Sequence, residues 1–301
     1  MKQSVIVHEV APRDGFQSVG PLIPTDEKIN IIEGLVSSGI SRIEIGSFVS
    51  PKALPQMADI AEISRHFAAR DDFQPYGLVP NARGVENALQ CNIKNLVYVF
   101  SATESHNQSN VRQSVADSIG RIQEINHLLR EESEASLRIA VATSFHCPFE
   151  GYVPVDKVIA ALDKVFDQVS DAEITLCDTT GKANSYVVRS LFEQVIARYP
   201  PATQWAFHGH DTYGLGVANA LFAYDAGVRI FDASAAGLGG CPFAPGATGN
   251  TATEDLVFAL EGADIGTGVN LQSLLQVADQ VSEIPGGVVN SHLRHVPREK
   301  I

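Results

Sequence analysis

The chain has 301 residues, of which 45% are hydrophobic and 19% charged, and its formal net charge at pH 7 is -13. This composition fits a globular protein with a large core, and the negative charge argues against binding to nucleic acid or to an anionic membrane surface. Four cysteines without C-x-x-C spacing, a start without a signal peptide and no apolar run that could span a bilayer lead us to expect a cytoplasmic protein.

Eight short segments rich in apolar and β-branched residues follow one another along the chain, and each precedes an amphipathic stretch. The expected strands are Val5–Val10, Arg42–Gly46, Gln74–Leu78, Asn95–Phe100, Arg138–Ser144, Glu173–Cys177, Gln204–His208 and Arg229–Ala233. The expected helices are Thr25–Ser38, Ala53–His66, Ala82–Gln90, Ser114–Glu132, Val155–Gln168, Ser185–Arg198, Val217–Ala226 and Thr253–Glu261.

Eight alternating βα units predict an α/β protein with a single (β/α)8 TIM barrel. We expect one catalytic domain over residues 1–301, with the barrel at about 5–265 and a C-terminal helix, Asn270–Ser282, and tail within 266–301. A doubly wound open sheet is the alternative. It would call for a glycine-rich phosphate loop after the first strand, and the segment PRDG at 12–15 is not one.

Function in such a barrel lies at the carboxyl ends of the strands, and polar residues follow several of the predicted strands. They are Arg13, Asp14, Glu44, Ser47, Asp178, Thr179, His208, His210, Cys241 and Asn250. Structural explanations exist for each: Arg13 and Asp14 could pair in a loop, and Cys241 could be a small buried hydrophobe. Asp178 and Asn250 could cap the helices that follow them. Their coincidence at one end of several strands favours a site.

The two histidines of His208-Gly209-His210 stand at the end of a predicted strand. Side chains at i and i+2 of a strand share a face, so both imidazoles would converge on one point, as a metal ion requires. Alone, such a pair is at least as often an ordinary polar loop. With Asp14 and Asn250 it makes a ligand set of oxygen and nitrogen without thiolate, which favours Mg²⁺ or Mn²⁺ over Zn²⁺.

Side-chain alternation also predicts which residues face the barrel interior. In the sixth strand Ile174, Leu176 and Asp178 share one face, which we expect to be an inward apolar column with Asp178 at its top. Gly209 is expected to point away from the histidines towards the helices, where a larger side chain would be usual.

Six motifs resemble those of 3-hydroxy-3-methylglutaryl-CoA (HMG-CoA) lyases, metal-dependent barrel enzymes related to the isopropylmalate and homocitrate synthases. They are EVAPRDG at 9–15, SFVSPK at 47–52, CPFEG at 147–151, HGHDTYG at 208–214, GLGGCP at 237–242 and GNTATEDL at 249–256. The resemblance spans nearly the whole chain. H-x-H-D and R-D-G recur throughout the group, whereas SFVSPK and GLGGCP are far more specific to the lyase branch.

The resemblance implies a divalent-metal-dependent retro-Claisen cleavage of HMG-CoA to acetyl-CoA and acetoacetate, as in leucine degradation, by a homo-oligomer. CoA enters as part of the substrate. Asp14, His208, His210 and Asn250 would hold the metal, and Arg13 would stabilise the thioester enolate. Glu44 would orient Arg13 or a metal-bound water. Cys241 on a mobile loop, with a histidine such as His208, would handle protons, and Asp178 would belong to a proton relay. We expect Gln17, Ser47, Lys52 and Thr179 to bind substrate; the position of Lys52 near a CoA phosphate is inferred from its charge alone.

Four residues depart from the family pattern: Phe16, Gly46, Phe149 and Gly209. We expect Gly46 and Phe149 to line the acyl pocket, so a citramalyl- or methylmalyl-type thioester is an alternative substrate. A Claisen-condensing synthase is a second alternative, although those relatives usually carry a further C-terminal domain. A non-catalytic binding protein is a third alternative, and it would predict a broken ligand set.

Overall fold

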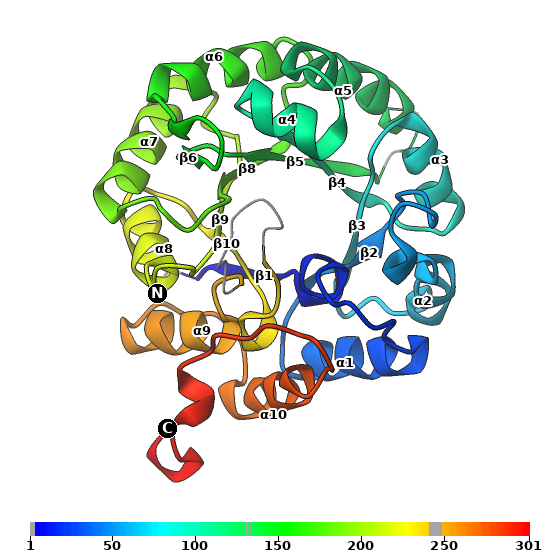
Figure 1. Ribbon diagram of the computed structural model, residues 1–301, viewed down its shortest axis with the longest axis vertical. Coiled ribbons are helices and arrows are strands. Elements are labelled where there is room, and N and C mark those ends of the chain that lie inside the picture. Colours follow the sequence, from blue (N-terminus) through cyan, green and yellow to red (C-terminus); the bar gives the residue numbers. More distant parts are fainter. Residues whose placement is uncertain (1–3, 131, 133, 241–248) are drawn as a thin grey trace.

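The computed structural model describes residues 4–130, 132, 134–240 and 249–301. Eight parallel strands close into a barrel surrounded by helices (Figure 1). In order around the barrel the strands are β1 (Ile6–Glu9), β2 (Arg42–Ser47), β3 (Gln74–Leu78), β4 (Asn95–Ser101), β5 (Ser136–Ala142), β8 (Glu173–Asp178), β9 (Trp205–Gly209) and β10 (Ile230–Ala233). Parallel pairing of β10 with β1 closes the ring, and the predicted TIM barrel is confirmed.

The helices lie outside the barrel, and each follows a strand (Figure 1). They are α1 (Thr25–Ser37), α2 (Ile60–Phe67), α3 (Ala82–Gln90), α5 (Val115–Leu129), α6 (Val155–Phe166), α7 (Ser185–Arg198), α8 (Gly216–Asp225) and α9 (Thr253–Gly262). The expected C-terminal helix is α10 (Leu271–Ser282), which packs against α1. Within the described ranges, no helix combines the length and the apolar character needed to cross a membrane.

Three details differ from the predicted elements. The helix expected from Ala53 begins at Ile60, because Pro55–Met57 forms a separate 3-10 turn, η2, and proline cannot continue a preceding helix. A short helix, α4 (Glu104–Val111), precedes α5. An antiparallel hairpin of β6 (His146–Cys147) and β7 (Gly151–Tyr152) follows β5.

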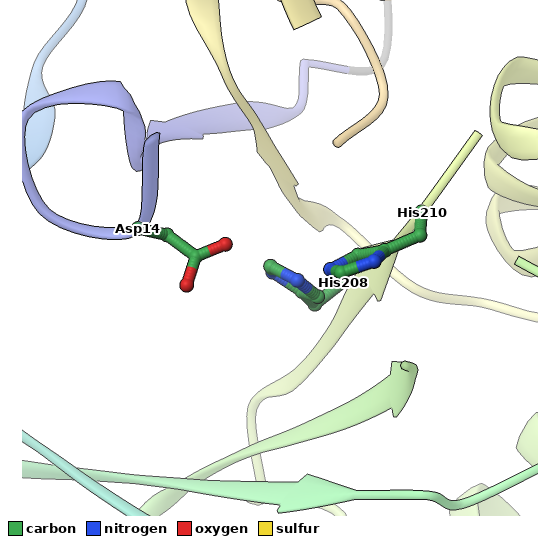
Figure 2. A group of neighbouring side chains, drawn as sticks. All are labelled: Asp14, His208 and His210. Carbon is green, nitrogen blue, oxygen red and sulfur yellow. The ribbon is translucent and has the colours of Figure 1, made fainter. Parts of the chain in front are cut away.

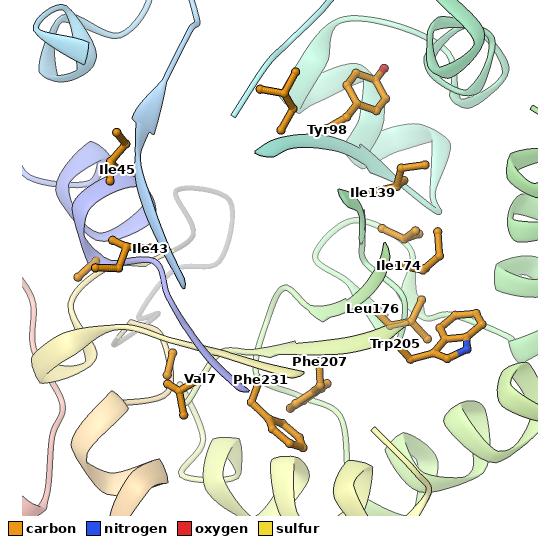
Figure 3. Packing of buried hydrophobic residues seen from close by; sticks show 14 of the residues in the cluster. Val7, Ile43, Ile45, Tyr98, Ile139, Ile174, Leu176, Trp205, Phe207 and Phe231 are labelled. Atoms are coloured by element: carbon orange, nitrogen blue, oxygen red, sulfur yellow. The ribbon is translucent and has the colours of Figure 1, made fainter. Parts of the chain in front are cut away.

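The main apolar core lies between the barrel and its helices. Side chains such as Val7, Leu176, Phe207 and Phe231 point outward from their strands into this layer (Figure 3). The expectation that Ile174 and Leu176 form an inward column was wrong, because both belong to this outer layer.

The barrel interior holds charged side chains instead. Glu44, Arg138 and Asp232 are all buried there, and their ion pairs and hydrogen bonds run between strands. The strands that carry Glu44, Arg138 and Asp232 therefore turn these charged residues inward and their large apolar neighbours outward.

Candidate active site

Three predicted ligands meet at the carboxyl end of the barrel. Asp14 lies in η1 (Ala11–Gly15), a π-helical turn that follows β1. His208 lies near the end of β9, and His210 directly follows this strand. One ligand atom from each residue lies within 4.8 Å of the other two, and all three residues are buried. Figure 2 shows the Asp14 carboxylate facing the two imidazoles. Strand alternation places His208 inside the barrel, as its spacing predicted.

Asn250 lies beside this cluster. Its Nδ2 donates to Oδ2 of Asp14 at 2.9 Å and to the carbonyl of Leu238 at 3.1 Å. Among the described residues, no partner reaches the buried Oδ1 of Asn250 or the buried Nδ1 of His210. Gly239 makes this approach possible: its φ is +132°, and a Cβ there would meet Asn250 Nδ2 at 2.5 Å.

The four residues fit a hard or borderline divalent cation. They offer carboxylate, amide and imidazole donors without thiolate, and two buried donor atoms lack a partner within the described part of the chain. Burial alone would raise the pKa of Asp14, but Arg13 and the two histidines hold it below its usual value. Burial and the nearby His208 lower the pKa of His210 to about 4. Both shifts favour the protonation states that bind metal.

An ion pair between Arg13 and Glu44 lies next to the cluster. Arg13 donates from Nε to Oε2 of Glu44 at 2.5 Å and from Nη1 to Oδ1 of Asp14 at 2.5 Å. Burial would raise the pKa of Glu44, but Arg13 and His8 hold it well below its usual value, so it stays ionised. Arg13 also lines a cavity at this end of the barrel, and no described residue accepts a hydrogen bond from its Nη2.

A cavity of about 440 Å³ opens over these residues. This volume is within the usual range for small-molecule sites. Its apolar wall comes from inward residues of β4 and β5, namely Val97, Val99, Ala140 and Ala142. The small alanines leave room for an acyl group.

Gly46 and Phe149 do not line this cavity, so that expectation was wrong. A Cβ on Gly46 would meet Ile60 Cδ1 of α2 at 2.5 Å, which places this glycine on the helix side of the barrel. Phe149 is 51% exposed on the hairpin that follows β5.

The four predicted substrate-binding residues besides Arg13 divide into two pairs. Gln17 and Thr179 line the cavity, with Gln17 Nε2 donating to Asp14 Oδ1 at 2.8 Å. Ser47 is buried outside it and accepts from the N–H of Val49 at 3.3 Å. Lys52 is exposed and does not line the cavity.

Asp178 is not brought into the cavity. It lies opposite Gly209 in the pairing of β8 with β9, on the outward face, and its Oδ2 accepts from the N–H of Ala183 at 3.0 Å. Burial raises its pKa to about 6, and the backbone N–H groups of the following loop oppose that rise. The position at the top of an inward column was wrong. The expected alternative, a cap of the next helix, is not met either, because Asn184 caps α7 (Ser185–Arg198) and Asp178 bonds to the loop before it.

Gly209 also lies on the outward face of its strand, where there is no space for a side chain. A Cβ at this position would meet Cε1 of Phe207 at 2.8 Å, so the aromatic ring fills the space that a side chain would take.

Sequence reasoning missed two charged residues of the interior, Arg138 and Asp232, which also line the cavity. Each stands in a predicted strand between two outward apolar neighbours. This alternation could have indicated them, because a charged residue at an inward position needs a partner across the barrel. Cys241, the predicted acid–base residue, lies outside the described residues.

Comparisons with known proteins agree with the motifs. A family model described as HMGL-like matches residues 4–281. The hydroxymethylglutaryl-CoA lyase YngG of Bacillus subtilis is 40% identical, covering 94% of this chain and 94% of the relative. (R)-citramalyl-CoA lyase of Chloroflexus aurantiacus is 37% identical, covering 94% and 92%. A solved HMG-CoA lyase from Acinetobacter baumannii, in complex with coenzyme A and 3-methylmalate, has a TM-score of 0.90 at 40% identity and covers 98% and 95%. The chain therefore belongs to the HMGL-like family.

Proposed function

We propose that this chain is a carbon–carbon lyase that cleaves HMG-CoA to acetyl-CoA and acetoacetate with a bound Mg²⁺ or Mn²⁺. The observation that carries the proposal is the buried cluster of Asp14, His208 and His210 beside Arg13, at the mouth of a cavity with an apolar wall. Relatives of about 40% identity that are named HMG-CoA lyases support the choice of substrate.

Asp14, His208, His210 and Asn250 would hold the metal. When bound, the divalent cation would supply Lewis acidity to the tertiary hydroxyl of the substrate and a fixed charge for its carboxylate. The chain's own residues prepare that position: Arg13 and Gln17 fix one oxygen of Asp14, and Asn250 fixes the other. Because Asp14 and Asn250 are buried and already hydrogen-bonded, little reorganisation would accompany binding.

The reaction removes the hydroxyl proton of the substrate, breaks the bond between C2 and C3 and releases a ketone. The bonding electron pair passes to the thioester as an enolate, which takes a proton on C2 to give acetyl-CoA. The negative charge that develops on the thioester oxygen is what the site must stabilise. Arg13 is held by Glu44 and keeps Nη2 free of described protein partners, so it can donate to that oxygen. Such a preorganised donor is worth about 3–4 kcal/mol.

Two residues were expected to act as acid–base groups, Cys241 and His208. His208 has its Nδ1 3.2 Å from Oδ2 of Asp232, which leaves Nε2 for the metal and favours a ligand role for this residue. We therefore propose Cys241, on the resemblance of GLGGCP at 237–242, as the group that protonates the enolate carbon.

Citramalyl-CoA is the second candidate substrate, because a relative named (R)-citramalyl-CoA lyase is 37% identical. Its acyl group lacks one methylene between the tertiary alcohol and the carboxylate. A hydrophobic pocket distinguishes such a difference by only about 1–3 kcal/mol, so both thioesters belong in any test.

The test is a panel of 3-hydroxyacyl-CoA thioesters incubated with the purified protein, Mg²⁺ or Mn²⁺ and a reductant, with products identified by mass. We expect acetyl-CoA and acetoacetate from HMG-CoA, and loss of both products in His208→Ala. If citramalyl-CoA is cleaved to acetyl-CoA and pyruvate much faster than HMG-CoA is cleaved, citramalyl-CoA would be assigned as the substrate instead. No product above the His208→Ala background from any thioester would overturn the proposal.

A further inference from the structure

Asp232 lies between a predicted metal ligand and a buried arginine. It faces His208 in the pairing of β10 with β9, and its Oδ2 is 3.2 Å from Nδ1 of His208. Its other oxygen, Oδ1, accepts from Nη2 of Arg138 at 2.5 Å. The side chains of Asp232 and Arg138 are 5% and 2% exposed, so water does not compete for these contacts.

We propose that Asp232 and Arg138 are positioning residues that fix the tautomer of His208, and so decide which of its nitrogens is free to bind the metal. The inference rests on the proposed metal site. Neither Asp232 nor Arg138 is a candidate ligand itself.

The tautomer follows from the donor and acceptor roles. A carboxylate accepts only, so Nδ1 of neutral His208 must carry the proton that Asp232 accepts. The proton is then absent from Nε2, whose lone pair is available to a cation. Without Asp232, both tautomers of the buried ring would be open.

Arg138 keeps Asp232 in this arrangement. Its Nε donates to Thr175 Oγ1 at 2.7 Å and pairs with Glu173 Oε1 at 2.8 Å, so the guanidinium is held by β8 while Nη2 faces β10. Because Oδ1 of Asp232 is committed to Arg138, only Oδ2 can meet His208. The network thus links β5, β8, β9 and β10 through the barrel interior.

Asp232→Asn tests whether Asp232 fixes the His208 tautomer, because the amide has one donating end and one accepting end and its neighbours determine which way it turns. Its NH2 group cannot face Nη2 of Arg138, since both are donors. The amide oxygen therefore turns to Arg138 and the NH2 group turns to His208, which forces Nδ1 to accept and moves the ring proton to Nε2. A nitrogen that carries a proton cannot ligate a metal.

The experiment measures Mn²⁺ binding by titration calorimetry. We expect Asp232→Asn to weaken Mn²⁺ binding by roughly 10- to 100-fold, the usual effect of losing such a partner. We expect Asp232→Asn combined with Arg138→Met to bind Mn²⁺ more tightly than Asp232→Asn alone, because the amide is then free to turn its oxygen to His208. Arg42→Met is the matched control, since Arg42 pairs with Glu173 at 2.8 Å and does not touch Asp232.

A second readout needs no substitution and no metal. Nitrogen chemical shifts of ¹⁵N-histidine-labelled protein report the protonated nitrogen of each ring, and His208→Ala assigns the resonance. At a pH where the metal-free ring is neutral, we expect the His208 proton on Nδ1 in the wild type and on Nε2 in Asp232→Asn. A proton on Nε2 in the wild type, or wild-type Mn²⁺ affinity in folded Asp232→Asn, would overturn the inference. If the wild type binds no Mn²⁺, the proposed metal site is overturned instead. The nitrogen chemical shifts would then still show whether Asp232 fixes the His208 tautomer.

Discussion

Arg13 and Glu44 form an ion pair inside the mouth of the barrel, with 2.5 Å between Nε and Oε2 and side chains 10% and 1% exposed. The contact uses one edge of the guanidinium and leaves Nη2 without a partner among the described residues. Glu44 therefore fixes the direction in which Arg13 can donate to a ligand.

Arg13→Lys should lower kcat by roughly 100- to 1,000-fold, the usual cost of losing an oxyanion donor. Lysine keeps the charge but has no planar fork, so it cannot contact Glu44 and an enolate oxygen in the same fixed geometry. Steady-state assays with HMG-CoA and calorimetry with Mn²⁺ check this. A parallel loss of Mn²⁺ affinity would show instead that Arg13 acts mainly through Asp14.

Glu44→Gln should also lower kcat, with a smaller effect on Mn²⁺ affinity. The amide can accept one hydrogen bond from Arg13 but brings no charge, so the buried guanidinium loses its main counterion. The kinetic constants of the Glu44→Gln and Arg13→Lys variants and of the double variant form a cycle. Additive losses would contradict the idea that Glu44 works through Arg13.

Cys241→Ser should fold and bind Mn²⁺ as the wild type does, yet lose most turnover. Serine keeps the size but is a far weaker acid than a thiol, so proton transfer to the enolate carbon slows. Single-turnover assays and calorimetry measure the two properties separately. Full turnover in Cys241→Ser would assign the proton transfer to another group.

The barrel and the ligands of the candidate site could be predicted from sequence because both depend on local patterns. Alternating apolar segments mark each βα unit, and the i, i+2 spacing of His208 and His210 puts both rings on one face whatever surrounds them. Helix α4 escaped prediction because ESHNQSNV at 104–111 contains a single apolar residue.

Partners that are distant in sequence could not be predicted in the same way. Arg138 and Asp232 are 94 positions apart, and only closure of the barrel brings them together. Asp178 was misplaced for a related reason: alternation shows that it shares a face with Leu176, but not which face is inward. Buried charges in the interior settle that choice, and they are visible only once the strands are assembled.

Glu254→Gln should change the pH dependence of stability. Burial raises the pKa of Glu254 to about 7. Hydrogen bonds from Ser291, from its own backbone N–H and from the N–H of Ala236, at 3.1 Å, oppose the rise. Because the folded pKa is above the unfolded value, the wild type should lose stability as pH rises from about 4.5 to about 7.

Denaturant unfolding between pH 4 and pH 8 checks this. At pH 8 the variant should be more stable than the wild type by something on the order of 1–3 kcal/mol, and the difference should vanish near pH 4. Glu124→Gln, on the exposed face of α5, removes the same charge and should show no such trend. A difference that stays constant with pH would mean that packing, not ionisation, separates Glu254→Gln from the wild type.

Gly209→Ala should destabilise the fold although it adds only one methyl group between two metal-ligand candidates. The new Cβ would lie 2.8 Å from Cε1 and 3.0 Å from Cζ of Phe207, a ring packed in the core, so backbone or ring must shift. Overpacking of this kind costs about 1–3 kcal/mol. Gly120→Ala on α5 is the matched control: a Cβ there meets nothing within 4 Å, and a helical glycine replaced by alanine gains stability. If steric conflict with the ring is the cause, Phe207→Leu should lower the free energy of unfolding by less in the Gly209→Ala background than in the wild type. Urea unfolding of the wild type, the two single variants and the double variant measures this. Equal costs in both backgrounds would place the damage of Gly209→Ala in the strand end itself, and Mn²⁺ affinity would then fall together with stability because His208 and His210 move with it.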